Sequence, residues 1–121
     1  MRGNARAALI LAIFLTSIPA VAEDAISIRV RPNVTQARGN AQLHVLVARD
    51  EMNRSLTWEV DGPSYYRSST FQLNGADSPR SFVFVVREIP AGEFEVRATV
   101  TRSDSSVAID RSTIRVIGGP G

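Results

Sequence analysis

The chain has 121 residues, the size of one domain, and contains no cysteine, so no disulfide can stabilise the fold. Its 14 basic residues exceed its 12 acidic ones only because Arg2 and Arg6 precede the first acidic residue; beyond them the balance is 12 against 12. This balance disfavours a nucleic-acid partner, because binding to phosphates needs a surplus of positive charge. A single hydrophobic core must therefore hold a nearly neutral chain together.

The first 22 residues have the three parts of a signal peptide. Arg2 and Arg6 supply the positive start, residues 7–15 form an apolar run, and Ala20 and Ala22 give the small-x-small site that a signal peptidase needs. The run is shorter than the ~20 apolar residues of a membrane-spanning helix. We therefore expect cleavage after Ala22 and an exported protein, periplasmic or secreted, without membrane contact; an uncleaved anchor helix is the alternative.

Apolar and polar residues alternate along much of the remaining chain, as in residues 92–100, which read Gly-Glu-Phe-Glu-Val-Arg-Ala-Thr-Val. Alternation with period two is typical of a strand with one buried and one hydrated face. Turn residues such as Pro32, Gly62 and Gly75 separate the alternating stretches. The sequence predicts seven strands, at residues 26–31, 41–48, 56–60, 65–73, 81–87, 93–101 and 107–117.

The last of these stretches changes its pattern part of the way along. Val107 and Ile109 are odd-numbered, whereas Ile114 and Val116 are even-numbered. Because side chains alternate between the two faces of a strand, the two pairs would face opposite ways. The sequence therefore predicts a bulge or a crossing between sheets at residues 110–113.

Two local features resemble known β-domains. Trp58 lies on the third predicted strand, and residues 89–94, Ile-Pro-Ala-Gly-Glu-Phe, form the turn that enters the sixth. This arrangement resembles bacterial immunoglobulin-like and fibronectin-type domains, although the inter-sheet disulfide is absent and Phe94 stands where a tyrosine corner would place a hydroxyl. The resemblance implies a seven-stranded antiparallel immunoglobulin-like sandwich over residues 23–117, followed by a flexible tail at residues 118–121.

No group of residues predicts catalysis. His44 is the only histidine, and one imidazole without partners builds neither a catalytic triad nor a zinc site. Glu93 and Glu95 come closest to an acid pair, but they share the hydrated face of a strand with Arg97, which favours cross-strand ion pairs. We therefore expect no catalytic residue, no metal site, no cofactor and a protein that is not an enzyme.

Tyr65, Tyr66 and Arg67 form the first of two candidate binding sites. Neighbouring residues on a strand point to opposite faces, so one tyrosine would enter the core while the other stands outside beside Arg67. An exposed tyrosine with an arginine is a common anchor for proteins or sugars. The alternative is a tyrosine that covers the rim of the core with its hydroxyl in water.

The predicted strand 81–87 is apolar on both faces and gives the second candidate site. Phe82 and Phe84 supply one face, and Val83 and Val85 supply the other. In an immunoglobulin-like arrangement this strand pairs with strand 41–48, so Val83, Val85 and Leu46 would form an exposed apolar patch. The high β-propensity of valine, or arginine stems lying across the patch, would explain the pattern without any partner.

The sequence therefore predicts an exported, non-catalytic β-sandwich that binds protein or fills a structural role in the cell envelope. Its partner would be another envelope or secreted protein, or a second copy of the chain. Carbohydrate binding through Tyr65 or Tyr66 is the alternative.

Overall fold

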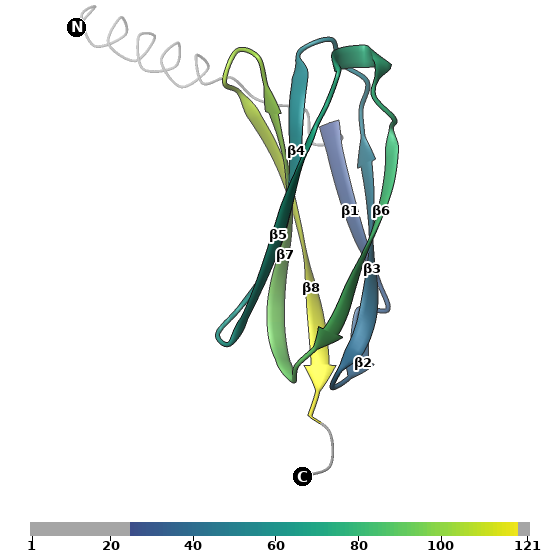
Figure 1. Cartoon of the computed structure of the whole chain (residues 1–121), viewed down its shortest axis with the longest axis vertical. Coiled ribbons are helices and arrows are strands. Elements are labelled where there is room, and N and C mark those ends of the chain that lie inside the picture. Colours follow the sequence, from purple (N-terminus) through teal and green to yellow (C-terminus); the bar gives the residue numbers. More distant parts are fainter. Residues whose placement is uncertain (1–24, 119–121) are drawn as a thin grey trace, which may run out of the picture.

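The computed structural model describes residues 25–118 and shows an all-β fold of two sheets packed face to face (Figure 1). The predicted signal peptide and residues 119–121 of the predicted tail lie outside the described residues, so both stay predictions. Within the described range, no helix has the length and apolar character needed to cross a membrane.

One sheet has three antiparallel strands in the order β1-β3-β6. They are β1 (Ile26–Arg31), β3 (Gly39–Val47) and β6 (Ser81–Ile89). Because β3 lies in the middle, β1 and β6 are the edge strands of this sheet in the part of the chain that the structure describes.

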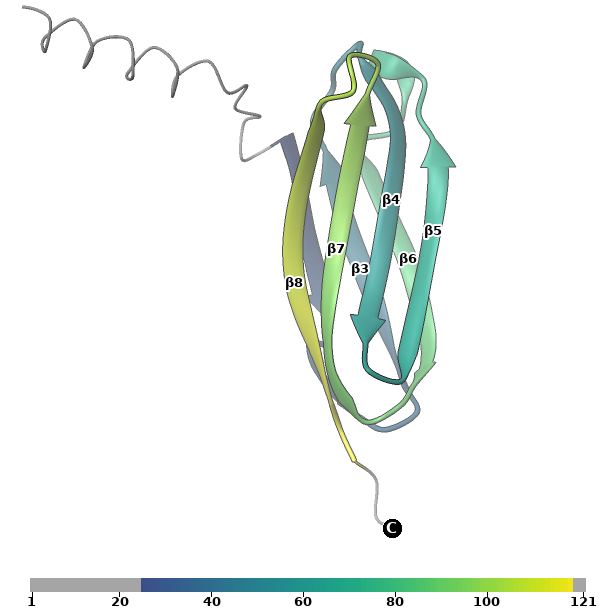
Figure 2. The ribbon, with the colours of Figure 1, turned by 90° about the vertical axis from the view of Figure 1, so that its left-hand side faces the viewer.

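The second sheet has five strands in the order β2-β8-β7-β4-β5, and β8, β7, β4 and β5 lie in front in Figure 2. Neighbouring strands are antiparallel except for β2 and β8, which are parallel. A short 3-10 helix, η2, connects the edge strand β5 to β6 of the other sheet. The bounds are β2 (Val34–Gln36), β4 (Asn53–Gly62), β5 (Tyr65–Gln72), η2 (Gly75–Asp77), β7 (Gly92–Arg102) and β8 (Val107–Ile117).

The core lies between the sheets, because the alternating apolar side chains of the strands turn inward from both sides. β3 and β7 show the pattern most clearly, with every second residue buried along nearly the whole strand. Phe94 on β7 is the largest of the fully buried side chains and lies over Gly62, where a side chain would overlap its ring. The alternation that predicted the strands therefore also selects the core.

The described residues form eight strands rather than the seven predicted. The additional strand is β2, where the sequence pattern predicts none. It pairs in parallel with the end of β8, so that Val34 lies opposite Arg115 and Thr35 opposite Val116. β2 has only three residues and its one apolar side chain, Val34, is exposed, so it leaves no alternating pattern in the sequence.

The predicted break in the last strand is wrong. β8 pairs with β7 along its whole length without a shift in register. Its even-numbered residues face inward throughout, whereas Val107 and Ile109 lie on the outer face of the sheet and are exposed. The two apolar pairs do face opposite ways, but the strand stays regular because Val107 and Ile109 remain on the hydrated face.

Asp110 occupies an inward position on β8, next to the edge strand β1. Its carboxylate Oδ2 accepts a hydrogen bond of 2.9 Å from the backbone N–H of Ile28. β1 is an edge strand, and this bond satisfies one of its outward-facing N–H groups. The two sheets are thus joined on the side where β1 lies beside β8.

Candidate functional site

The outer face of the three-stranded sheet carries an exposed apolar patch beside the edge strand β6, formed by Leu46 on β3 and by Val83 and Val85 on β6. Their side chains are 54%, 53% and 45% exposed, and we call this group the β6 patch. His44 lies opposite Val83 in the register, is half-buried, and shares a hydrogen bond of 3.1 Å with Gln42. The structure therefore brings together the three residues that sequence analysis selected as one candidate site.

A shallow hollow of about 450 Å³ adjoins the β6 patch. It is lined by Ser27 on β1, by Leu46 and Val47 at the end of β3, and by Ala48 and Arg80, which follow β3 and precede β6. Leu46 thus belongs both to the patch and to the hollow. The hollow therefore lies between the β6 patch and the end of the sheet that holds the first residues of β6.

The phase of the β3–β6 ladder shows which backbone groups of β6 are free. The Val47 N–H donates to the Arg80 carbonyl at 2.8 Å. Hydrogen-bonded pairs alternate along an antiparallel ladder, so the N–H and C=O groups of Phe82, Phe84 and Val86 point toward β3. Those of Ser81, Val83 and Val85 point to the other side, where β6 has no neighbouring strand within the described residues.

A row of aromatic side chains lines the inner side of this edge. Phe84 on β6 stacks on Phe71 of β5, with ring centroids 4.9 Å apart, and also lies 5.8 Å from Trp58 and 6.0 Å from Phe82. Phe71 stays 40% exposed although it faces inward, because β5 and β6 are both edge strands at the same side of the sandwich (Figures 1 and 2). We call these four residues the aromatic row.

Trp58 carries an unusual polar group within this row. Its indole Nε1 is buried and has no hydrogen-bond partner among the described residues. A buried donor without an acceptor destabilises a fold by about 1–3 kcal/mol. Neither Trp58 nor the row was selected as a site from sequence, because each aromatic residue by itself has the position of an ordinary core residue.

The structure separates Tyr65, Tyr66 and Arg67 by face. Tyr65 points inward, packs edge-on against Phe94 at 5.6 Å and donates a hydrogen bond of 3.2 Å to the Arg87 carbonyl. The Arg67 guanidinium lies 5.3 Å from the centre of the Tyr65 ring, a cation–π arrangement. The expectation that Arg67 stands beside the exposed tyrosine is therefore wrong: residues two apart share a face, so Arg67 accompanies Tyr65.

Tyr66 lies on the outer face of the five-stranded sheet, where its ring is 54% exposed. Its hydroxyl donates a hydrogen bond of 2.6 Å to Glu59 on the neighbouring strand β4. This hydrogen bond and the neighbouring Arg97 hold the pKa of Glu59 below its usual value. The same bond raises the pKa of Tyr66, because the neutral hydroxyl is the donor. Tyr66 is thus the tyrosine that stands outside, and it is part of a charged network.

Arg97 on β7 is the centre of this network. It pairs with Glu95 at 2.8 Å, Glu59 at 3.3 Å and Asp61 at 3.5 Å, and Glu95 also pairs with Arg111 at 3.6 Å. Contacts with these carboxylates raise the pKa of Arg97. The ion pairs lie on a hydrated face, where each contributes little to stability. This face therefore has the character of a solvated ladder, as the sequence predicts for Glu93 and Glu95.

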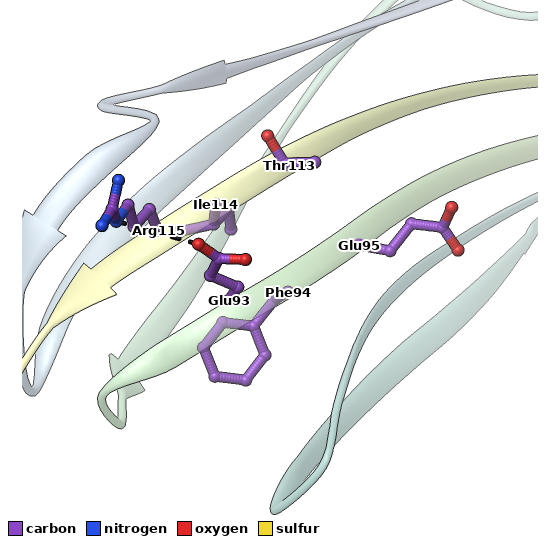
Figure 3. Close-up of a pocket in the computed structure, with 6 residues that line it drawn as sticks. All are labelled: Glu93, Phe94, Glu95, Thr113, Ile114 and Arg115. Carbon is purple, nitrogen blue, oxygen red and sulfur yellow. Dashed lines mark ion pairs between the residues drawn. The ribbon is translucent and has the colours of Figure 1, made fainter.

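Glu93, Glu95, Thr113 and Arg115 line a hollow of about 340 Å³ between β7 and β8. Figure 3 shows Glu93 beside Arg115 and Glu95 farther along β7. Glu93 pairs with Arg115 at 3.8 Å, and both side chains are largely exposed. Neither glutamate is enclosed, so the pair lacks the buried setting in which two carboxylates take separate catalytic roles. Among the described residues, no group of three or more His, Cys, Asp or Glu side chains could hold a metal ion.

No protein-family model and no curated protein sequence matches the chain. Solved structures do resemble it. A superoxide reductase (neelaredoxin) from Ignicoccus hospitalis is similar with a TM-score of 0.61 and 13% identity, over 76% of this chain and 80% of the reductase. The sporulation control protein Spo0M from Bacillus subtilis is similar with a TM-score of 0.54 and 13% identity, over 78% of this chain and 49% of Spo0M.

These similarities define the chain as an all-β sandwich. They also contradict the prediction that the chain is not an enzyme, because superoxide reductase is an enzyme built on a similar architecture. That prediction was based on the lack of a catalytic residue cluster in the sequence, and a β-sandwich architecture can host many unrelated activities. At 13% identity the likeness extends to the fold alone.

Proposed function

We propose that the chain is exported and acts in the cell envelope as a module that binds protein through the edge strand β6. The observation that carries the proposal is that β6 is an edge strand with apolar side chains on both faces. Natural sheets protect their edges with prolines, charges or bulges. Residues 81–86 contain no proline and no charge, and the one register irregularity of β6 lies beyond them.

A partner segment in extended conformation would fit this edge by strand addition. The free N–H and C=O groups of Val83 and Val85 would pair with its backbone and supply affinity. Side chains on one face of the added strand would lie beside the β6 patch, and those on the other face beside Phe71 and Phe84. Such an edge favours a segment that carries apolar side chains on both faces, because each face would meet apolar surface.

Export of this module is supported by the first 22 residues, which have the positive start, apolar run and small-x-small site of a signal peptide. The partner would then be another envelope or secreted protein, or the chain itself. We further propose that the sandwich is immunoglobulin-like. The order β1-β3-β6 against β8-β7-β4-β5 supports this, since it corresponds to strands A-B-E and G-F-C-C′ of that fold.

Carbohydrate recognition is the alternative, and it would depend on Tyr66. Its ring is exposed and has Glu59 and Ser68 as polar neighbours. Tyr65 cannot extend the same platform, because it points to the other side of β5. Binding to a glycan array that disappears in Tyr66→Ala, with the fold intact, would favour this alternative over strand addition.

Site-specific photocrosslinking in the native cell tests the main proposal. A photoreactive amino acid replaces Val83, and the matched control carries it at Thr113, which is exposed on the outer face of the other sheet. We expect a discrete adduct from position 83 and none from position 113. Equal labelling at both positions, or no adduct from position 83, would overturn the assignment of β6 as the binding edge.

A further inference from the structure

We propose that the strand added to β6 is β6 of a second copy of the chain, in antiparallel register with Phe84 opposite the partner's Phe84. This inference rests on the proposed function, because it names the occupant of the same edge. The strand is compatible with itself in three respects: the phase of its free backbone groups, the sizes of its side chains and the position of its charge.

The backbone phase allows two copies of β6 to pair. Val83 and Val85 both direct their N–H and C=O groups to the free edge, as derived from the Val47–Arg80 hydrogen bond. In the proposed register Val83 lies opposite the partner's Val85, and Val85 opposite the partner's Val83. Both are therefore hydrogen-bonded pairs, placed symmetrically about the two-fold axis. The Arg87 carbonyl already accepts the Tyr65 hydroxyl, which limits the pairing at the outer ends.

The side chains select this register among those that keep inner faces opposite inner faces. With Phe84 on the axis, Phe82 lies opposite the smaller Val86, and Arg87 lies opposite Ser81. Moving the pairing so that Val85 lies on the axis would place Arg87 against Val83, a charge against an apolar side chain. Moving it the other way would place Phe82 opposite the partner's Phe84 at two symmetric positions, two bulky pairs in place of one, and would leave Val86 opposite Arg80.

The inner side supplies a further reason for a second copy. Phe71 is 40% exposed beside Phe84, at the opening between β5 and β6. A two-fold axis at Phe84 would bring the aromatic rows of the two copies together across this opening. The association stops at two copies, because each copy uses its one free β6 edge. The two three-stranded sheets then form a continuous six-stranded sheet in which β6 is no longer an exposed edge.

The absence of cysteine allows a test of the register with introduced pairs. Opposite residues of a hydrogen-bonded pair have Cα atoms ~5.5 Å apart, within the range for a disulfide. Under mild oxidation, Val83→Cys mixed with Val85→Cys should therefore form the cross-linked dimer about tenfold faster than either variant alone, because each alone places its cysteines only diagonally. Thr113→Cys, on the other sheet, is the control and should stay uncrosslinked.

Proline variants test whether the edge itself associates. Val85→Pro removes an N–H that points to the free edge, whereas Phe84→Pro removes one that bonds to β3. By sedimentation equilibrium, we expect wild type to be a dimer, Val85→Pro to be a monomer that still melts cooperatively, and Phe84→Pro to lose the fold. A Val85→Pro variant that stays dimeric, or single-cysteine variants that crosslink as fast as their mixture, would overturn the proposed interface.

The oligomeric state and the photocrosslinked adduct from position 83 together show whether a failure concerns this inference or the proposed function. If wild type is monomeric at its highest soluble concentration, a second copy is not the occupant. An adduct between position 83 and a different protein would then leave the proposed function standing and overturn only this inference. An adduct with twice the mass of the chain would support both, and no adduct at all would contradict both.

Discussion

At the scale of single residues, Tyr66 and Glu59 show how one hydrogen bond changes the protonation of two groups. The neutral Tyr66 hydroxyl donates to the Glu59 carboxylate, so the contact favours the charged form of Glu59 and the neutral form of Tyr66. The pKa of Glu59 is therefore lowered and that of Tyr66 is raised. Both groups lie at the hydrated face, where water limits the size of the effect.

We predict that Glu59→Gln lowers the pKa of Tyr66 toward its ordinary value of 10.0. The amide keeps an oxygen that can accept the hydrogen bond but loses the negative charge that opposes deprotonation. The near-ultraviolet absorbance of tyrosinate, followed during a pH titration, measures the change. Tyr65→Phe in the background leaves Tyr66 as the single tyrosine. An unchanged titration in Glu59→Gln would show that the hydrogen bond does not persist in solution.

Gly62 is a second position where one residue has a clear physical requirement. A Cβ at Gly62 would overlap the ring of Phe94, which is only 2% exposed and cannot move aside. We predict that Gly62→Ala destabilises the fold by about 1–3 kcal/mol, the usual cost of overpacking a core. Chemical denaturation measures this loss. Gly118→Ala is the control, because its Cβ would lie at an ordinary 3.6 Å from Ala91 and should change little.

At the scale of elements, the edge strands β1 and β6 of the three-stranded sheet differ in the hydrogen bonding of their outward-facing backbone groups. On one side, the edge strand β1 lies beside β8, and Asp110 accepts the Ile28 N–H. On the other side, no side chain of the described residues accepts a hydrogen bond from the N–H of Val83 or Val85 on the edge strand β6. One N–H of the β1 edge is therefore satisfied by a side chain of the same chain, whereas the free groups of Val83 and Val85 on β6 are available for pairing.

We predict that Asp110→Ala destabilises the fold by about 1–3 kcal/mol, because it leaves the partly buried Ile28 N–H without an acceptor. Asp110→Asn should lose less, since its amide oxygen can still accept the bond. Thermal denaturation gives the ranking, and hydrogen exchange at Ile28 reports on the bond itself. Asp77→Ala, at an exposed aspartate of η2, is the matched control. Slow exchange of Ile28 in Asp110→Ala would contradict this role.

At the scale of the whole molecule, acid should weaken the fold through two carboxylates with lowered pKa. Glu59 accepts hydrogen bonds from Tyr66 and Arg97, and Asp104 accepts them from Ser106 in the turn between β7 and β8. A lowered pKa in the folded state means that the unfolded chain binds more protons at acidic pH. Each group therefore stabilises the fold above its unfolded-state pKa, and this contribution is lost as the pH falls through the folded-state pKa.

We predict that the free energy of unfolding decreases as the pH falls below about 5 and that the Glu59→Gln/Asp104→Asn double variant decreases less over the same range. The difference in the free energy of unfolding between wild type and the double variant should not change with pH near neutrality, because both carboxylates are charged there in the folded and unfolded states. Urea denaturation at a series of pH values measures it. Parallel curves for wild type and variant at acidic pH would show that other groups govern acid sensitivity.

Much of this fold can be predicted from local sequence because the buried face follows alternation along each strand. The inward residues of β3 and β7 and the outward positions of Leu46, Val83 and Val85 all follow from period two. Two features do not: β2 is too short to alternate, and the regular course of β8 depends on exposed Val107 and Ile109. The face of Arg67 does follow from period two, so its expected place beside the exposed tyrosine was an error of parity.

The sequence by itself determined which side chains share a face, since that depends only on the parity of residues along one strand. The tertiary structure decided which strands are neighbours and which edges are free, because pairing joins residues far apart in the chain. Leu46 and Val83 become one surface only through the β3–β6 register, and Phe71 meets Phe84 only across the two sheets. The free edge of β6, on which the proposed function depends, is a property of strand order that no local pattern contains.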